Sequence, residues 1–103
     1  MTLTEFLRAR IAEDETNDTT LIGVARKDWA ARWLAECDAK RRIVDLHVER
    51  EYECSRCDTG YWDENDDGAE VYGARPEAYP CETLRTLALP YADHPDYRDE
   101  WRP

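Results

Sequence analysis

The sequence predicts a mainly α fold with little β: an N-terminal helix packed on a long second helix, then a β-hairpin and a short C-terminal helix. Three observations lead to this expectation. Apolar residues recur at helical spacing from residue 3, residues 28–59 contain neither proline nor glycine, and a glycine-marked turn signal separates two β-prone pieces after that stretch. A chain of 103 residues is the size of one domain, so we expect residues 1–103 to share one modest core.

Two helices are predicted in the first half of the chain. Thr2 and Glu5 have the spacing of a capping box, and the apolar residues that follow predict a helix over about Leu3–Glu15. The stretch DETNDTT is predicted to be a loop, because its side chains compete for backbone hydrogen bonds. The long second helix is predicted over about Trp29–Glu49. Its apolar stripe consists of Trp33, Leu34, Cys37, Val44 and Val48.

The second half of the chain is predicted to hold the hairpin and the short helix. The pieces TGYW and AEVYG flank DENDDG, whose Asp67-Gly68 pair is a hairpin turn signal. A short helix is predicted between Pro80 and Pro90, because proline suits the first turn of a helix and also ends one. The segment DHPDYRDEW predicts a final helical turn.

The net charge of −10 is concentrated in one segment. Residues 51–73 hold eight acidic side chains and one basic side chain, a net charge of −7. Such a surface repels phosphate backbones, which makes a nucleic-acid partner unfavourable. No apolar run approaches the roughly 20 residues that span a bilayer, and the N-terminus lacks the plan of a signal peptide, so we expect a cytoplasmic protein without membrane contact. In that reducing compartment, four cysteines are expected to be thiols or metal ligands.

A candidate metal site lies in residues 47–81. Cys54 and Cys57 form a Cys-x-x-Cys pair, the spacing in which one tight turn presents two thiolates to a tetrahedral ion. His47 and Cys81 complete the pattern His-x6-Cys-x2-Cys-x23-Cys. Cys81 is expected at a helix N-terminus, where backbone N–H groups favour a thiolate. This Cys3His set predicts structural zinc, and the hairpin becomes a zinc-held one that compensates for a small core.

Other assignments of these residues stay open. Cys54 and Cys57 fit free thiols in an exposed loop, with His47 an ordinary residue at a helix end. His94 is an alternative fourth ligand. Cys37 lies on the apolar stripe and is predicted to be a small core residue.

Catalytic, redox and calcium sites are weaker interpretations. If His47 does not bind, three cysteines and a water would form a catalytic site. The candidate bases would then be Glu49, Glu51, Glu53 and Glu82. A thioredoxin-like role needs a βαβ unit, which is not predicted. DENDDG resembles the start of a calcium loop, but Ala74 occupies the position of the required glutamate, so we predict a solvated hairpin tip.

Three segments carry a family resemblance: TEFLRARIAEDE, AKRRIVDLH and PCETLRTLALPYADHPDYRDEWRP. The chain resembles a small family of actinobacterial proteins of unknown function, typical of Streptomyces and its relatives and also found in their phages. The resemblance implies that His47, Cys54, Cys57 and Cys81 recur in the family pattern and that Cys37 does not. It implies no activity.

These observations predict a small zinc-structured protein-interaction module, regulatory or phage-related, without a catalytic site. Its binding surface is expected to be the acidic face, which a DNA mimic would also present, or the aromatics Tyr61, Trp62 and Tyr72. A homodimer through the long helix is a further expectation. The alternatives are a zinc hydrolase and a zinc-dependent nucleic-acid-binding module. The latter would use Lys40, Arg41, Arg42, Arg50 and Arg56.

Overall fold

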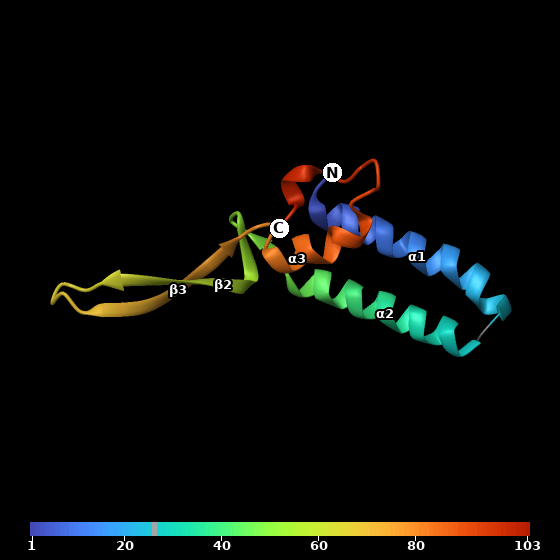
Figure 1. Ribbon diagram of the computed structural model, residues 1–103, viewed down its shortest axis with the longest axis horizontal. Coiled ribbons are helices and arrows are strands. Elements are labelled where there is room, and N and C mark those ends of the chain that lie inside the picture. Colours follow the sequence, from blue (N-terminus) through green and yellow to red (C-terminus); the bar gives the residue numbers. More distant parts are fainter. Residues whose placement is uncertain (26) are drawn as a thin grey trace.

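The computed structural model describes the backbone of residues 1–25 and 27–103 and the side chains outside residues 17–28. Two helices pack side by side as a helical pair (Figure 1). They are α1 (Leu3–Ala25) and α2 (Lys27–Leu46). A sheet follows, formed by β1 (Glu49–Arg50), β2 (Glu53–Glu64) and β3 (Glu70–Ala78). The chain ends with helix α3 (Glu82–Ala88) and the 3-10 turns η1 (Leu89–Tyr91) and η2 (Asp99–Trp101).

The predicted mainly α class with a long second helix is wrong. Within the described residues the fold is α+β, with three helices and a three-stranded antiparallel sheet in the order β1-β2-β3. Helix α1 has 23 residues and α2 has 20, so the second helix does not dominate the pair. The sequence indicates two short β-prone pieces, whereas β2 has 12 residues and β3 has nine.

Helix α1 continues through DETNDTT, where a loop was predicted. Contacts with α2 favour the helix there. The Trp33 indole N–H donates to the backbone oxygen of Asp14 at 3.0 Å, and Arg41 forms an ion pair with Glu15. Such tertiary contacts outweigh the weak helix propensity of Asn, Asp and Thr.

Helix α2 ends at Leu46 rather than at the predicted Glu49. The Ser55 hydroxyl donates to the backbone oxygen of Leu46 at 3.3 Å and accepts from the N–H of Val48 at 3.0 Å. One side chain of β2 therefore satisfies a carbonyl that the end of the helix leaves free and an N–H just beyond the helix. Glu49 pairs with Cys54 and so belongs to the sheet.

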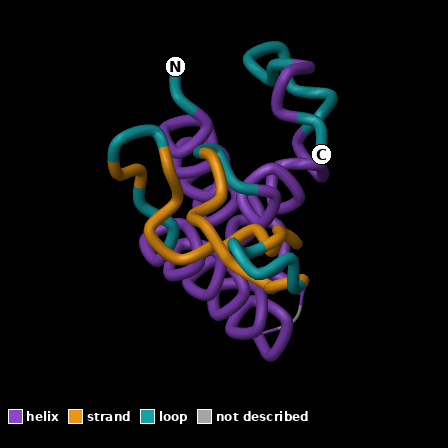
Figure 2. The backbone as a smooth tube through the Cα atoms, turned by 90° about the vertical axis from the view of Figure 1, so that its left-hand side faces the viewer, coloured by secondary structure: helices purple, strands orange, loops and turns teal. Residues whose placement is uncertain are grey.

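Strands β2 and β3 form a long hairpin that projects away from the helices (Figure 1). Viewed along its length, the hairpin lies in front of the helical pair (Figure 2). The regular pairing runs from Asp58 opposite Pro76 to Glu64 opposite Glu70. The molecule is elongated as a result, with principal extents of 68 × 29 × 20 Å.

The core lies among the helices and the C-terminal segment, with Phe6 of α1 at its centre. The Phe6 side chain is completely buried, and its ring centroid lies 5.1 Å from that of Trp101 and 5.9 Å from that of Tyr97. Tyr97 and Trp101 contact each other at 5.6 Å. The other buried apolar side chains of this helical core are Leu3, Leu7, Ile11, Cys37, Val44, Leu84 and Ala88. Among the described residues, no helix is long and apolar enough to cross a membrane.

Candidate metal centre

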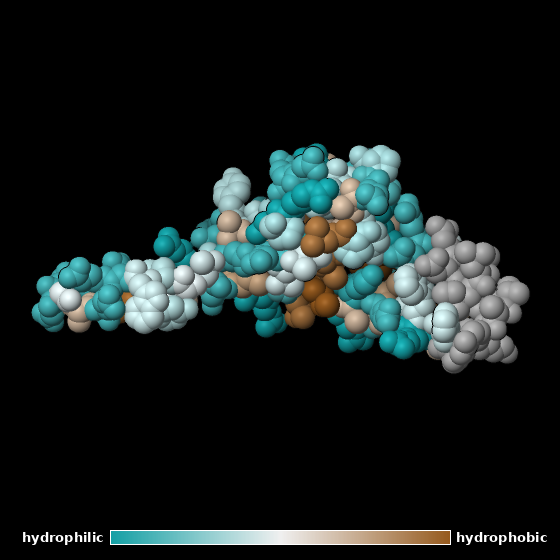
Figure 3. Space-filling view, viewed as in Figure 1, coloured by the Kyte–Doolittle hydropathy of each residue, from teal (hydrophilic) through white to brown (hydrophobic). Residues whose placement is uncertain are grey.

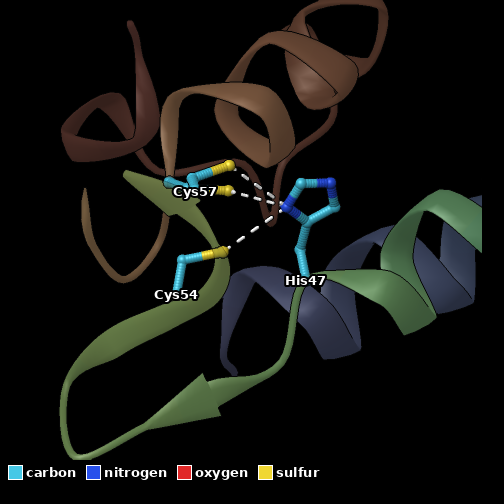
Figure 4. Close-up of side chains that lie close together, drawn as sticks. His47, Cys54 and Cys57 are labelled. Carbon is cyan, nitrogen blue, oxygen red and sulfur yellow. Dashed lines mark hydrogen bonds between the residues drawn. The ribbon is translucent and has the colours of Figure 1, made fainter. Parts of the chain in front are cut away.

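Four side chains from three segments meet where the sheet joins the helices. His47 lies directly after α2, Cys54 and Cys57 lie on β2, and Cys81 directly precedes α3. Their ligand atoms all lie within 4.8 Å of one another. In Figure 4 the thiols of Cys54 and Cys57 point toward the imidazole of His47. The fold thus brings together all four residues that the sequence predicts as ligands, in an arrangement able to bind a metal ion.

The nitrogen–sulfur distances within the cluster are close to those of a tetrahedral site. The Nδ1 atom of His47 lies 3.4 Å from Sγ of Cys54, 3.3 Å from Sγ of Cys57 and 3.6 Å from Sγ of Cys81. A tetrahedral ion with metal–nitrogen bonds of about 2.0–2.1 Å and metal–sulfur bonds of about 2.3 Å separates nitrogen and sulfur by about 3.6 Å. The three nitrogen–sulfur separations are close to this value, so each agrees with an imidazole and a thiolate that share one small ion.

The cluster is largely shielded from solvent. Cys54 is 3% exposed and Cys81 is completely buried, whereas Cys57 and His47 are partly exposed. All of these cysteines are free thiols although their sulfur atoms lie close together. Buried thiol groups gathered around an imidazole, without a disulfide, are a typical donor set for a thiolate-preferring metal ion.

The two buried thiols differ in acidity. Burial raises the pKa of the Cys81 thiol to about 12; the backbone at Leu84 opposes this, and neighbouring Cys54 adds to it. Burial also acts to raise the pKa of Cys54, but hydrogen bonds with the backbone of Arg56 and Cys57 outweigh it and hold that pKa below 9.0. The backbone at the start of α3 thus favours the thiolate of Cys81, as expected, while burial favours the thiol. A cation within the cluster would favour the thiolate form of both residues.

Two local features of the backbone position the cysteine pair. The turn between β1 and β2 consists of Glu51 and Tyr52, both with positive φ (51° and 70°), which suits a tight two-residue hairpin. Between Glu53 and Asp58 the pairing of β2 with β3 is irregular. The Cys54–Cys57 segment lies in this irregularity, so its side chains are free from strict strand alternation and both reach His47.

Residues outside the predicted set support Cys57 and Cys81. The carboxylate of Glu77 accepts a hydrogen bond of 2.7 Å from the backbone N–H of Glu82, which fixes the start of α3 beside Cys81. The hydroxyl of Thr83 lies 3.7 Å from Sγ of Cys57. Neither contact has a sequence signal, because the first depends on the path of the chain between β3 and α3 and the second on the position of α3 beside β2.

Two predicted alternatives lie elsewhere. His94 packs edge-on against Phe6, with centroids 5.7 Å apart, and contacts the guanidinium of Arg10. It is not a member of the cluster. Cys37 is 1% exposed within the helical core, in agreement with its predicted structural role.

No carboxylate belongs to the cluster among the residues that the structure describes. The candidate bases Glu49, Glu51, Glu53 and Glu82 are all exposed. The acidic stretch DENDDG forms the hairpin tip, where Asn65 accepts backbone hydrogen bonds from Asp67 and Ala69 and Gly68 has a φ of 79°. The sequence-based interpretation of this stretch as a solvated turn agrees with the structure.

Comparison with known proteins identifies a family. No curated protein and no solved structure matches the chain. The profile of a family of unknown function, DUF6221, matches residues 1–103. The chain therefore belongs to the DUF6221 family.

Proposed function

We propose that this protein is a zinc-structured protein-interaction module, in which His47, Cys54, Cys57 and Cys81 bind one structural zinc ion. The observation that carries the proposal is the set of three nitrogen–sulfur distances of 3.3–3.6 Å around Nδ1 of His47. Three thiolates and one imidazole are the donors of many structural zinc sites, and they occupy all four positions of a tetrahedral ion. A closed ligand set supports a structural role over the alternative of a zinc hydrolase, which needs an open position.

The position of the cluster explains what a metal ion would contribute. The four ligands come from the end of α2, from β2 and from the start of α3. Direct packing between the sheet and the helices is sparse. Most contacts between elements lie within the sheet or among the helices. A zinc ion supplies strong, geometrically fixed bonds without redox chemistry. Bound here, it would fix the hairpin to the helices.

Protein binding is proposed because the hairpin is exposed and acidic. Strand β2 from Asp58 onward is exposed throughout. Two of the bases that a nucleic-acid-binding module would use are already paired, Arg41 with Glu15 and Arg42 with Asp38, which supports a protein partner over a nucleic acid. The four cysteines form no disulfide, which supports a reducing compartment, so we propose a cytoplasmic location. A homodimer through α2 stays a prediction, and sedimentation equilibrium tests it.

Metal analysis of untagged protein tests the zinc assignment. Inductively coupled plasma mass spectrometry is expected to give about one zinc per chain. Replacement of zinc by Co²⁺ should produce the intense visible bands and the thiolate charge-transfer band of a tetrahedral sulfur-rich site. A protein that folds normally, contains no metal and takes up no Co²⁺ would show that the cysteines are free thiols.

A further inference from the structure

The outer part of the hairpin, residues 58–77, is here called the arm, and its own side chains stabilise it. The ring of Tyr72 lies over Gly60, where an added Cβ would overlap the tyrosine hydroxyl. The ring of Tyr61 lies over Gly73 in the same way, with an added Cβ 2.6 Å from Cζ. The guanidinium of Arg75 stacks on Tyr61 at 4.7 Å. Rings that cover glycines of the opposite strand strengthen the ribbon, so both tyrosines have a structural role.

Trp62 has no comparable role within the arm. It pairs with Tyr72, edge to face, with ring centroids 5.2 Å apart, yet 70% of its surface remains exposed. Tyr72 beside it is 65% exposed. An exposed tryptophan on a projecting ribbon is the residue type that most often anchors a protein–protein interface. The exposed aromatic pair therefore indicates a contact surface.

The charge around Trp62 defines the chemistry of the partner. The arm contains seven acidic side chains and one arginine, a net charge of −6 out of −10 for the whole chain. These acidic residues are Asp58, Asp63, Glu64, Asp66, Asp67, Glu70 and Glu77. None of them takes part in an ion pair with another described residue. In Figure 3 the arm is hydrophilic to intermediate in hydropathy, and the most hydrophobic surface lies over the helices.

A surface recess places the aromatic and acidic groups together. Its lining consists of Trp62, Asp63, Glu64, Gly68 and Glu70. An indole face attracts a cation, and adjacent carboxylates accept hydrogen bonds from a guanidinium or an ammonium group. Phosphate backbones and a second copy of this acidic chain would both be repelled.

We propose that the arm is the docking surface for an arginine- or lysine-rich segment of a partner protein, with one cationic side chain beside Trp62 in this recess. This inference deepens the proposed interaction function and names the partner chemistry. It depends on the metal centre only for the attachment of the arm to the helices. The aromatic pair supplies apolar area that the partner would bury on binding. The carboxylates orient the cationic side chains of the partner and select for positive charge.

Nuclear magnetic resonance with an amidated octa-arginine peptide tests the proposal, on full-length protein whose metal content has been measured in the same sample. We expect salt-sensitive shifts of the Trp62 indole N–H and of the arm amides, with little change at the buried indole of Trp101. Octa-glutamate and a short DNA duplex are expected to cause no shifts. Shifts confined to the helices, or no shifts at all, would overturn the proposal. So would a Trp62 signal that moves with protein concentration alone.

Matched variants separate a specific site from general attraction to an acidic protein. Trp62→Ala should weaken octa-arginine binding at least about tenfold, whereas Trp29→Ala, which removes a tryptophan that is 54% exposed on α2, should change it less than about twofold. The double variant Glu64→Gln, Glu70→Gln should also weaken binding about tenfold. A control with the same change in charge, Asp99→Asn, Glu100→Gln, should have little effect. Equal weakening of octa-arginine binding by both double variants would show that the peptide responds only to the net charge of the protein. That result would overturn the proposal.

The metal measurement keeps the two proposals distinguishable. Protein with one zinc per chain that shows no response at Trp62 would contradict the docking surface and leave the zinc assignment intact. Protein without metal that binds octa-arginine through Trp62 would contradict the zinc assignment and support the docking surface.

Discussion

Replacing Cys81 by serine is the most informative test of the metal centre. The Cys81 sulfur is completely buried and lies 3.6 Å from Nδ1 of His47. A serine hydroxyl stays protonated near neutral pH and is a poor zinc ligand. Structural zinc binding is worth about 10–16 kcal/mol, so one of four ligands accounts for roughly 2.5–4 kcal/mol. At about 1.4 kcal/mol per tenfold change, Cys81→Ser should weaken zinc binding by two to three orders of magnitude.

Competition with a chromophoric chelator near pH 7 measures this change directly. Cys37→Ser is the matched control, because Cys37 is 1% exposed but lies outside the cluster. That variant buries a hydroxyl in the core and should lose about 1–3 kcal/mol of unfolding free energy with unchanged zinc affinity. If Cys81→Ser binds zinc as tightly as the wild type, or if Cys37→Ser loses zinc to the same extent, the four-ligand assignment is wrong.

Three further predictions test other parts of the structure. Burial and a 2.6 Å hydrogen bond to Asp14 raise the pKa of Tyr91, so this residue stabilises the fold fully below pH 10 and loses that effect as the pH rises. Urea titrations should therefore show Tyr91→Phe about 1.5–3 kcal/mol less stable than wild type at pH 8, with a gap that narrows above pH 10; a constant gap would contradict this account. Gly60→Ala should displace the ring of Tyr72 and speed amide hydrogen exchange in β2 and β3, while exchange in α1 stays unchanged. Exchange rates in β2 and β3 equal to those of the wild type would refute the aromatic–glycine contact. Phe6→Ala should cost about 3–5 kcal/mol in chemical denaturation, and a loss below about 1 kcal/mol would place the core elsewhere.

The ligand cluster could be predicted from the sequence because its key information is local or chemical. The Cys-x-x-Cys spacing of Cys54 and Cys57 is typical of metal ligands, and the residue types at 47 and 81 complete a known donor set. The structure places this pair on an irregular part of β2 rather than in the predicted tight turn. The choice of His47 over His94 follows from the fold alone. His94 is held against Phe6 and Arg10, a contact between segments more than 80 residues apart that no spacing rule reveals.

The fold class could not be predicted because the decisive contacts are nonlocal. DETNDTT has loop-forming side chains, yet α1 continues through it where Trp33 and Arg41 contact its backbone and side chains. The length of the hairpin depends on cross-strand contacts such as that of Tyr72 over Gly60. A single strand sequence does not reveal these contacts, and a glycine within it predicts a weak strand instead. Local propensity therefore underestimated both the first helix and the sheet.

The location of the cluster follows from what an exposed ribbon needs. A two-stranded hairpin is marginally stable on its own, and the arm is almost entirely exposed, with none of the described helices packed on either face. Contacts between its own rings and glycines stabilise it along its length, but they cannot orient it relative to the helices. Orientation requires rigid bonds at the base, where β2 leaves the helices, and the base is where His47, Cys54, Cys57 and Cys81 converge. Cys54 and Cys81 also belong to the buried apolar cluster, and a metal ion bound there would join three segments through four side chains. Trp62 belongs neither to the Cys/His cluster nor to the helical core, which agrees with the proposed role of the arm as a docking surface.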